Sequence, residues 1–135
     1  MSTDPENIDV ENICRHWIDT SEEDYRTMLN LYDAKSYTWA LFIGHISVEK
    51  LLKAYYVKLF RKQAPYIHNL LRLAESTKLD ISDEYADILD KITFFNINAR
   101  YEDYKREFYL KCTPEYTMEW IEKIKLIRTW IIQKL

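Results

Sequence analysis

The chain has 135 residues, 47% of them hydrophobic and 30% charged, which is typical of a globular domain rather than a disordered segment. Its net charge is −3 and its pI is near 5.6, so no overall basic field indicates DNA binding, although a local basic patch would escape this test. The single glycine, Gly44, excludes glycine-rich phosphate loops and disfavours tight turns between strands, so we expect one all-α domain over residues 1–135.

Five helices are predicted along the chain. The first begins at Asp4-Pro5-Glu6, because a capping residue followed by proline is a typical helix start. Its apolar residues continue in phase to Tyr32, so one long helix is favoured, although residues 21–24 could cap a new one. The second spans about residues 36–62 and ends before Pro65. A short third helix covers about residues 67–77.

The last two predicted helices are long. Ser82 caps a fourth helix, which is predicted to run unbroken from Asp83 to about Tyr109. Thr113-Pro114-Glu115 opens a fifth, which continues to the end of the chain. Four long amphipathic helices and one short one predict an all-α, up-and-down bundle.

The second helix carries two charged residues on an apolar face. Glu49 and Lys53 lie four residues apart and so share that face. A helix that is apolar over more than half its circumference is either central in the bundle or also contacts another subunit. The core strip is Leu41, Val48, Leu51, Leu52, Tyr55 and Leu59, and the second strip is Phe42, Ile46, Val57 and Phe60. With Leu126 and Trp130 on the last helix, the second strip predicts a two-fold dimer that buries on the order of 1,200 Å² or more.

Two polar residues break the apolar pattern of the fourth helix. Asn96 sits within its core stripe, and Arg100 lies one turn beyond, at the edge. Because buried polar groups need partners, we expect Glu49 to lie within direct or one-water hydrogen-bonding reach of Arg100 or Asn96. The Lys53 ammonium is expected nearer solvent. This network either fixes helix register or belongs to a site.

Further candidates lie outside this network. Tyr101, Tyr104 and Tyr109 alternate with basic residues and can stack on bases of a nucleotide or RNA; otherwise they form a solvated helix end. His68 follows a proline turn and opens a helix, which is typical of a structural anchor bonded to a neighbouring element.

The cysteines and the length of the apolar runs indicate where in the cell the protein is expected. Cys14 and Cys112 have no CxxC spacing and no histidine cluster nearby, so they are interpreted as reduced intracellular thiols. No signal peptide and no apolar run of about 18 residues is present. We therefore expect a cytoplasmic protein that does not contact membranes, with no metal site and no cofactor.

Three motifs resemble the HEPN domain in their order and spacing over roughly residues 12–134. They are Ser47 to Tyr55 (SVEKLLKAY), then Pro65 with His68-Asn69-Leu70, then Ala99 to Tyr104 (ARYEDY). The resemblance implies a small, usually dimeric helical bundle of a prokaryotic family that is often encoded beside a minimal nucleotidyltransferase. Family members have been linked to nucleotide binding, and many are metal-independent ribonucleases in toxin, defence or RNA-processing systems.

The ribonuclease branch of that family carries Arg, then four to six residues, then His. Such a pair suits the chemistry, because His can transfer a proton while Arg stabilises the anionic phosphate. Here the positions after Arg100 where His should stand hold Lys105, Arg106 and Glu107. Arg61 and His68 have the right spacing but flank a loop elsewhere in the fold, which we interpret as coincidence. No catalytic residue is therefore predicted.

Three hypotheses remain from the sequence. The first is a non-catalytic HEPN-type binding or regulatory module, a homodimer that recognises a nucleotide, RNA or a nucleotidyltransferase partner in a toxin–antitoxin or defence system. The second is a ribonuclease with a degenerate site around Arg100 or the Arg61/His68 pair. The third is a purely structural interaction protein. The candidate binding residues are Glu49, Lys53, His68, Asn96, Arg100, Tyr101 and Tyr104.

Overall fold

The computed structural model describes residues 8–135, and within this range it contains six helices and no strand. The helices are α1 (Val10–Asp33), α2 (Tyr37–Phe60), α3 (Leu70–Glu75), α4 (Asp83–Asn98), α5 (Glu102–Lys111) and α6 (Pro114–Ile132). The predicted all-α bundle is thereby confirmed. The predicted helix start at Asp4-Pro5-Glu6 lies outside the described residues.

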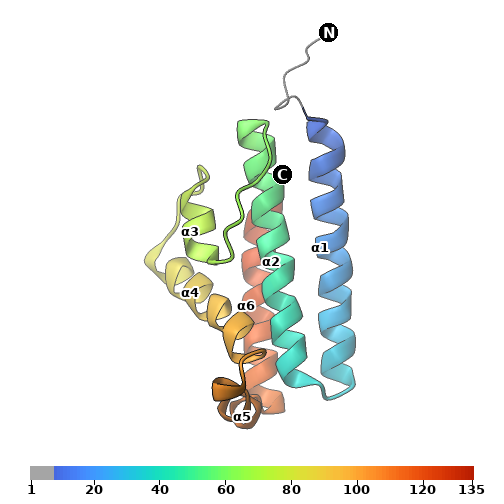
Figure 1. Ribbon diagram of the computed structural model, residues 1–135, viewed down its shortest axis with the longest axis vertical. Coiled ribbons are helices and arrows are strands. Elements are labelled where there is room, and N and C mark those ends of the chain that lie inside the picture. Colours follow the sequence, from blue (N-terminus) through green and yellow to red (C-terminus); the bar gives the residue numbers. More distant parts are fainter. Residues whose placement is uncertain (1–7) are drawn as a thin grey trace.

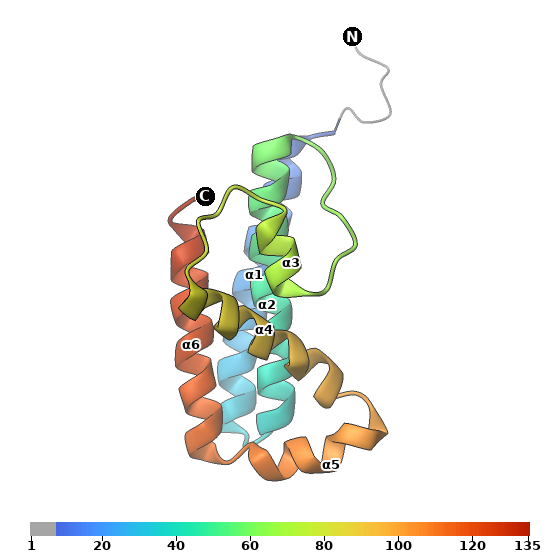
Figure 2. The ribbon, with the colours of Figure 1, turned by 90° about the vertical axis from the view of Figure 1, so that its left-hand side faces the viewer.

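The central element is α2, which contacts each of the other five helices. In Figure 1, α2 lies beside α1 as an antiparallel hairpin, with α6 behind it. Figure 2 shows α4 running diagonally across α2 and α6. Of the 24 residues of α2, 13 are buried, which explains an apolar surface wider than a single stripe. Val57 is fully buried, so this member of the predicted dimer strip belongs to the core. Trp130 likewise packs edge-on against Tyr85, with ring centroids 4.9 Å apart.

A buried arginine joins α6 to α1. Arg128 is 3% exposed, and its Nη1 donates to the Ser21 hydroxyl while Nη2 donates to Glu22 Oε2 at 2.8 Å. The Ser21 hydroxyl in turn donates to the Ser47 carbonyl of α2 at 2.6 Å. Ser21 therefore acts as a cross-link between helices, and α1 continues through it as one helix, as predicted.

The predicted fourth helix is in fact two helices, a correction to the expected count of four long helices and one short one. The chain leaves α4 after Asn98, and Tyr101 is extended (φ −89°, ψ 129°) before α5 begins. In an unbroken helix Phe108 would lie about 220° around the axis from Phe95, on nearly the opposite side. The break turns α5 back toward the bundle, where Phe108 is 3% exposed and stacks on Phe95. Burial of this ring outweighs the continuation of the helix.

The remaining expectations concern the first residues of two helices, the two cysteines and membrane-spanning helices. Asn69 caps α3 by accepting from the Arg72 N–H, so α3 begins at Leu70, later than predicted. Thr113 caps α6 as predicted. Cys14 and Cys112 are free thiols, as expected. None of the helices from α1 to α6 is long and apolar enough to cross a membrane.

Candidate functional site

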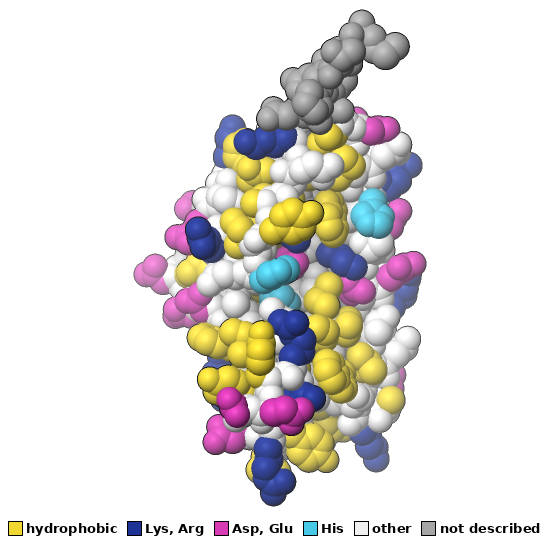
Figure 3. Space-filling model, viewed as in Figure 1, with side chains coloured by type: hydrophobic (Ala, Val, Ile, Leu, Met, Phe, Trp, Pro, Cys, Tyr) yellow, Lys and Arg dark blue, Asp and Glu magenta, His cyan; other side chains and the backbone are white. Residues whose placement is uncertain are grey.

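A cleft of about 250 Å³ lies between α2 and α4, and His68 of the loop before α3 also lines it. Its lining residues are Phe42, His45, Ile46, Glu49, His68, Asn96 and Arg100. Figure 3 shows histidine side chains and, next to them, Lys or Arg side chains in a row between two groups of hydrophobic side chains on this face. The cleft thus joins four of the seven predicted binding residues.

Glu49 is the one carboxylate among the lining residues of the cleft, and it is 8% exposed. Its Oε1 is 3.0 Å from His68 Nδ1, and its Oε2 is 3.1 Å from Lys53 Nζ. Lys53 is only 7% exposed, and its ammonium lies 5.3 Å from the centroid of the Trp17 ring. The expectation that Lys53 extends to solvent was wrong, because its charge is matched internally by Glu49 and the face of an indole.

Among the described residues, neither Arg100 nor Asn96 donates a direct hydrogen bond to Glu49, although all three line the same cleft. The direct form of the predicted contact is therefore absent, and its one-water form stays a prediction. Both oxygens of Glu49 are taken by Lys53 and His68. Arg100 lies beyond the end of α4, so its side chain folds back and Nε donates to the Asn96 carbonyl at 3.0 Å. The network is therefore divided in two, a buried part around Glu49 and an exposed part at Arg100.

Two histidines connect the loop before α3 to α2. His68 is exposed and is oriented by Glu49, while its carbonyl accepts from His45 Nε2 at 3.2 Å. His45 is 1% exposed, and burial lowers the pKa of its ring below the ordinary value. Its Nδ1 is buried and has no partner among the described protein groups. The anchoring role predicted for His68 fits this geometry, whereas His45 was missed, although its position one turn before Glu49 was visible in the sequence.

The aromatic candidates lie at the edge of the cleft. The Arg100 guanidinium is 5.8 Å from the Phe42 ring centroid and 5.6 Å from that of Tyr101, which is 54% exposed. Tyr104 is half exposed on α5 and does not line the cleft. The structure therefore brings Tyr101, but not Tyr104, into contact with the other candidates.

From residue 8 onward, no three His, Cys, Asp or Glu side chains are grouped so that they could hold a metal ion. The Lys53 ammonium beside Glu49 would also repel a cation there. Besides the paired Glu49 carboxylate, the cleft presents the Arg100 guanidinium, the exposed His68 imidazole and the Phe42 ring. A guanidinium and an imidazole can donate hydrogen bonds to an anionic ligand.

The sequence model of the HEPN domain matches residues 14–135, which is most of the chain. The chain belongs to the HEPN domain family. Among solved structures, this HEPN chain is similar to the protein TT1696 from Thermus thermophilus, with a TM-score of 0.76 and 20% identity over 90% of this chain and 98% of that chain. At this identity the likeness shows the fold alone. No protein of curated function is significantly similar in sequence.

HEPN membership places the chain among nucleotide- and RNA-related helical modules. In the sequence, no histidine follows Arg100 at the spacing of the HEPN arginine–histidine pair. The structure nevertheless brings a histidine near Arg100. His68 comes from the loop before α3, yet it lines the same cleft as Arg100. An arginine and a histidine are therefore brought to one cleft by the fold rather than by sequence spacing.

Proposed function

We propose that this HEPN protein is a non-catalytic binding module whose α2–α4 cleft recognises the phosphate group of a nucleotide or RNA. The observation that carries the proposal is the Arg100 guanidinium. It is exposed, is fixed by its Nε on the Asn96 carbonyl, and has no carboxylate within ion-pair distance in residues 8–135. The terminal N–H groups of such an arginine match two phosphate oxygens in a bidentate contact.

The rest of the cleft supports an anionic ligand. The Glu49 carboxylate would repel a phosphate, but Lys53 and His68 bind both of its oxygens. The exposed ring of Tyr101 beside Arg100 offers a surface on which a base can stack. Phosphate and base recognition are thus supported by neighbouring side chains.

Binding of a fluorescein-labelled single-stranded RNA and of AMP tests the proposal. Arg100→Gln should weaken binding by about tenfold or more, since hydrogen bonds to charged groups contribute about 1.5–3 kcal/mol. It should leave stability within about 0.5 kcal/mol, because the side chain is exposed. Arg106→Gln, on α5 and outside the cleft, is the matched control. Unchanged affinity would refute the proposal, and a large loss of stability would instead favour a purely structural network.

A ribonuclease is the second candidate, and the Glu49–His68 contact favours it. A carboxylate that accepts from Nδ1 holds the imidazole so that Nε2 can take a proton, while Arg100 on the same cleft can stabilise a phosphate. We expect no cleavage of single-stranded RNA above background. Cleavage that His68→Ala abolishes, with an unchanged melting temperature, would replace the binding proposal by this one.

The proposal also includes two protein partners, a second copy of this chain and a minimal nucleotidyltransferase. A homodimer and a minimal nucleotidyltransferase partner, in a toxin–antitoxin or defence system, are supported by HEPN membership. The neighbouring open reading frame is the simplest check. A nucleotidyltransferase that is encoded there and co-purifies with this chain would support this partner. The absence of such a gene and of a co-purifying nucleotidyltransferase would count against it.

A further inference from the structure

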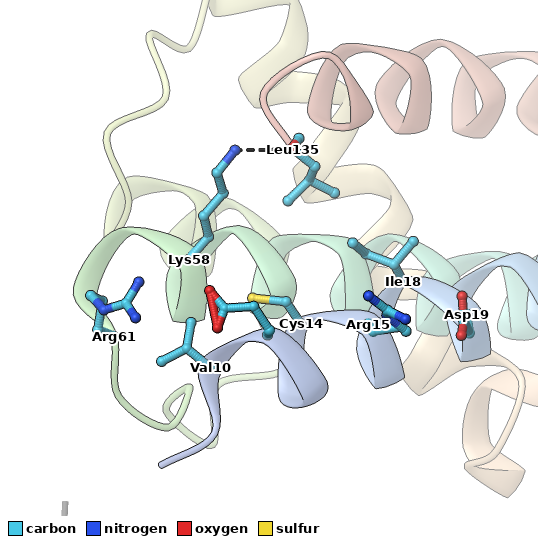
Figure 4. A pocket seen from close by; sticks show the side chains of 9 residues that line it. Val10, Cys14, Arg15, Ile18, Asp19, Lys58, Arg61 and Leu135 are labelled. Carbon is cyan, nitrogen blue, oxygen red and sulfur yellow. Dashed lines mark hydrogen bonds between the residues drawn. The ribbon is translucent and has the colours of Figure 1, made fainter. Parts of the chain in front are cut away.

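A second and larger pocket, of about 460 Å³, lies where α1 begins, α2 ends and the chain after α6 returns. Figure 4 shows side chains of these three segments around it. It is lined by Val10, Glu11, Cys14, Arg15, Ile18, Asp19, Lys58, Arg61 and Leu135, none of which lines the α2–α4 cleft. Its size lies within the usual range for small-molecule sites.

Apolar atoms make up most of the surface of the pocket, although five of its nine lining residues are charged. Val10, Ile18 and Leu135 contribute aliphatic side chains. Cys14 adds a thiol that donates to the Ala54 carbonyl at 3.4 Å, so it needs no partner from a ligand. An apolar wall with a few charged groups is the usual composition of a site for a small organic molecule.

The charges around the pocket are unevenly distributed. Glu11, Arg15 and Asp19 follow one another at intervals of four on α1, so the two carboxylates flank that arginine on the same helix face. Arg61 has no Asp or Glu side chain within ion-pair distance in residues 8–135. Both lining carboxylate side chains belong to α1, whereas the side chains from the end of α2 are the cations Lys58 and Arg61. The α2 side of the pocket is therefore positive.

The two cations are held differently. Lys58 Nζ donates to the Lys134 and Leu135 carbonyls at 3.1 and 2.8 Å, which fixes its position (Figure 4). Arg61 ends α2 in the left-handed region, at φ 55° and ψ 39°. Glycine is the usual residue at such a position, since a β-carbon is disfavoured there. An arginine kept at this backbone position places a guanidinium at the pocket at some expense of stability.

We propose that this pocket binds a small amphipathic anion, a carboxylate with an unbranched aliphatic chain. The carboxylate contacts the Arg61 guanidinium beside the Lys58 ammonium. The chain lies along Val10, Ile18 and Leu135. This site is independent of the proposed phosphate-binding cleft.

Decanoate and its neutral analogue decanol are suitable probes, measured by calorimetric titration on the full chain. Decanoate should bind saturably, and Arg61→Gly should weaken it by about tenfold or more, because a charge-assisted contact is lost. The same substitution should raise the melting temperature, since glycine relaxes the left-handed residue. A loss of binding in a stabilised protein cannot be attributed to unfolding.

Lys35→Gly is the matched control. Lys35 is the other non-glycine residue with a positive φ, at 62°, and it lies outside this pocket. Its replacement should raise the melting temperature likewise but leave decanoate binding unchanged. Methyl NMR shifts of Val10, Ile18 and Leu135 should report the aliphatic chain. Equal affinity of Arg61→Gly and wild type, equal affinity for decanol and decanoate, or the absence of saturable binding would each overturn the proposal.

Discussion

Glu49 is a carboxylate enclosed by the bundle whose oxygens are divided between a lysine on its own helix and a histidine on a distant loop. Enclosure of a carboxylate and an ammonium together is tolerated because each compensates the other. Removal of one partner leaves the other enclosed and unpaired. A substitution that removes the charge of Glu49 but keeps the size and shape of its side chain therefore measures its contribution to stability best.

Glu49→Gln should lower the free energy of unfolding by about 3 kcal/mol, because it leaves the Lys53 ammonium nearly buried without its carboxylate. Urea denaturation near neutral pH measures this. Glu102→Gln is the control, since Glu102 forms a 3.4 Å pair with Lys105 in which its own side chain is 87% exposed. That pair should contribute less than about 1 kcal/mol. Equal effects of the two substitutions would contradict the assigned role of Glu49.

His45 should make stability depend on pH. Burial lowers the pKa of His45 below its ordinary value of 6.5, and the charges of His68 and Arg100 lower it further, while the His68 carbonyl and Glu49 raise it. The unfolded chain therefore binds a proton at His45 more readily than the folded chain. Stability from this group is present above pH 6.5 and falls as the pH drops below that value.

Urea denaturation at several pH values from about 5 to 8 tests this effect. His45→Gln, which has no titratable ring, should flatten the dependence below pH 6.5 relative to wild type. His16→Gln should leave it unchanged, because His16 is exposed on α1. An identical pH profile for His45→Gln and wild type would show that His45 is not the group responsible.

The sequence predicted the position of Glu49 in an apolar face but not its partners. Lys53 was the local candidate, at one turn of helix, yet it was assigned to solvent because lysines usually extend outward. His68 reaches Glu49 only through the conformation of the loop after Arg61, which has no periodicity to analyse. Contacts within one helix could be predicted from spacing, whereas contacts through a loop could not.

At the scale of elements, Gly44 shows how closely three helices approach. A β-carbon placed on Gly44 would lie 2.5 Å from Ile124 Cδ1 on α6 and 2.9 Å from Met28 Sδ on α1. Glycine therefore leaves space here for the Ile124 and Met28 side chains, which would have to shift to admit a β-carbon. Backbone freedom is not the reason, since the φ of Gly44 is not positive.

Gly44→Ala should lower stability by about 1–3 kcal/mol through overpacking, although alanine favours the helix by about 1 kcal/mol. Ile124→Val removes the Cδ1 atom that the new methyl group would meet. The double variant should therefore be more stable than the sum of the two single changes predicts, and a double-mutant cycle by urea denaturation measures the difference. If the two substitutions change the free energy of unfolding additively, the Ile124 Cδ1 atom is not the atom that the new methyl group meets.

The helices could be predicted from the sequence where the capping residues and the apolar periodicity indicate the same bounds. Thr113-Pro114 marked the start of α6, and the apolar phase through Ser21 identified α1 as one helix. The break between α4 and α5 has no proline or glycine to mark it. It arises from the packing of Phe108 on Phe95, which is a tertiary contact and overrides local propensity.

At the scale of the whole molecule, large aromatic side chains remain exposed on α2 and α4, the two helices between which the cleft lies. Trp39 is 42% exposed and packs edge-on against Phe42, which lines the cleft. Phe94 on α4 is 54% exposed. A group of large apolar side chains of this kind usually marks an interface. Within the predicted dimer strip, Val57 and Trp130 belong to the bundle, whereas Phe60 and Leu126 stay 37% and 43% exposed. Trp39 and Phe94 add exposed apolar surface on α2 and α4, and we expect the dimer contact on this face.

A two-fold dimer formed through this face should bury on the order of 1,200 Å² or more. Sedimentation velocity at tens of micromolar should show a dimer for wild type. Phe94→Asp should give a monomer with an unchanged helical spectrum, because it places a charge in the apolar interface without touching the core. Leu126→Asp tests the other exposed part of the predicted strip, on α6, where Leu126 is 43% exposed. If the contact lies on α2 and α4, this variant should remain dimeric. A wild-type monomer would refute the dimer itself. A dimer that only Leu126→Asp dissociates would place the interface on α6 and leave the cleft open to solvent in the assembly.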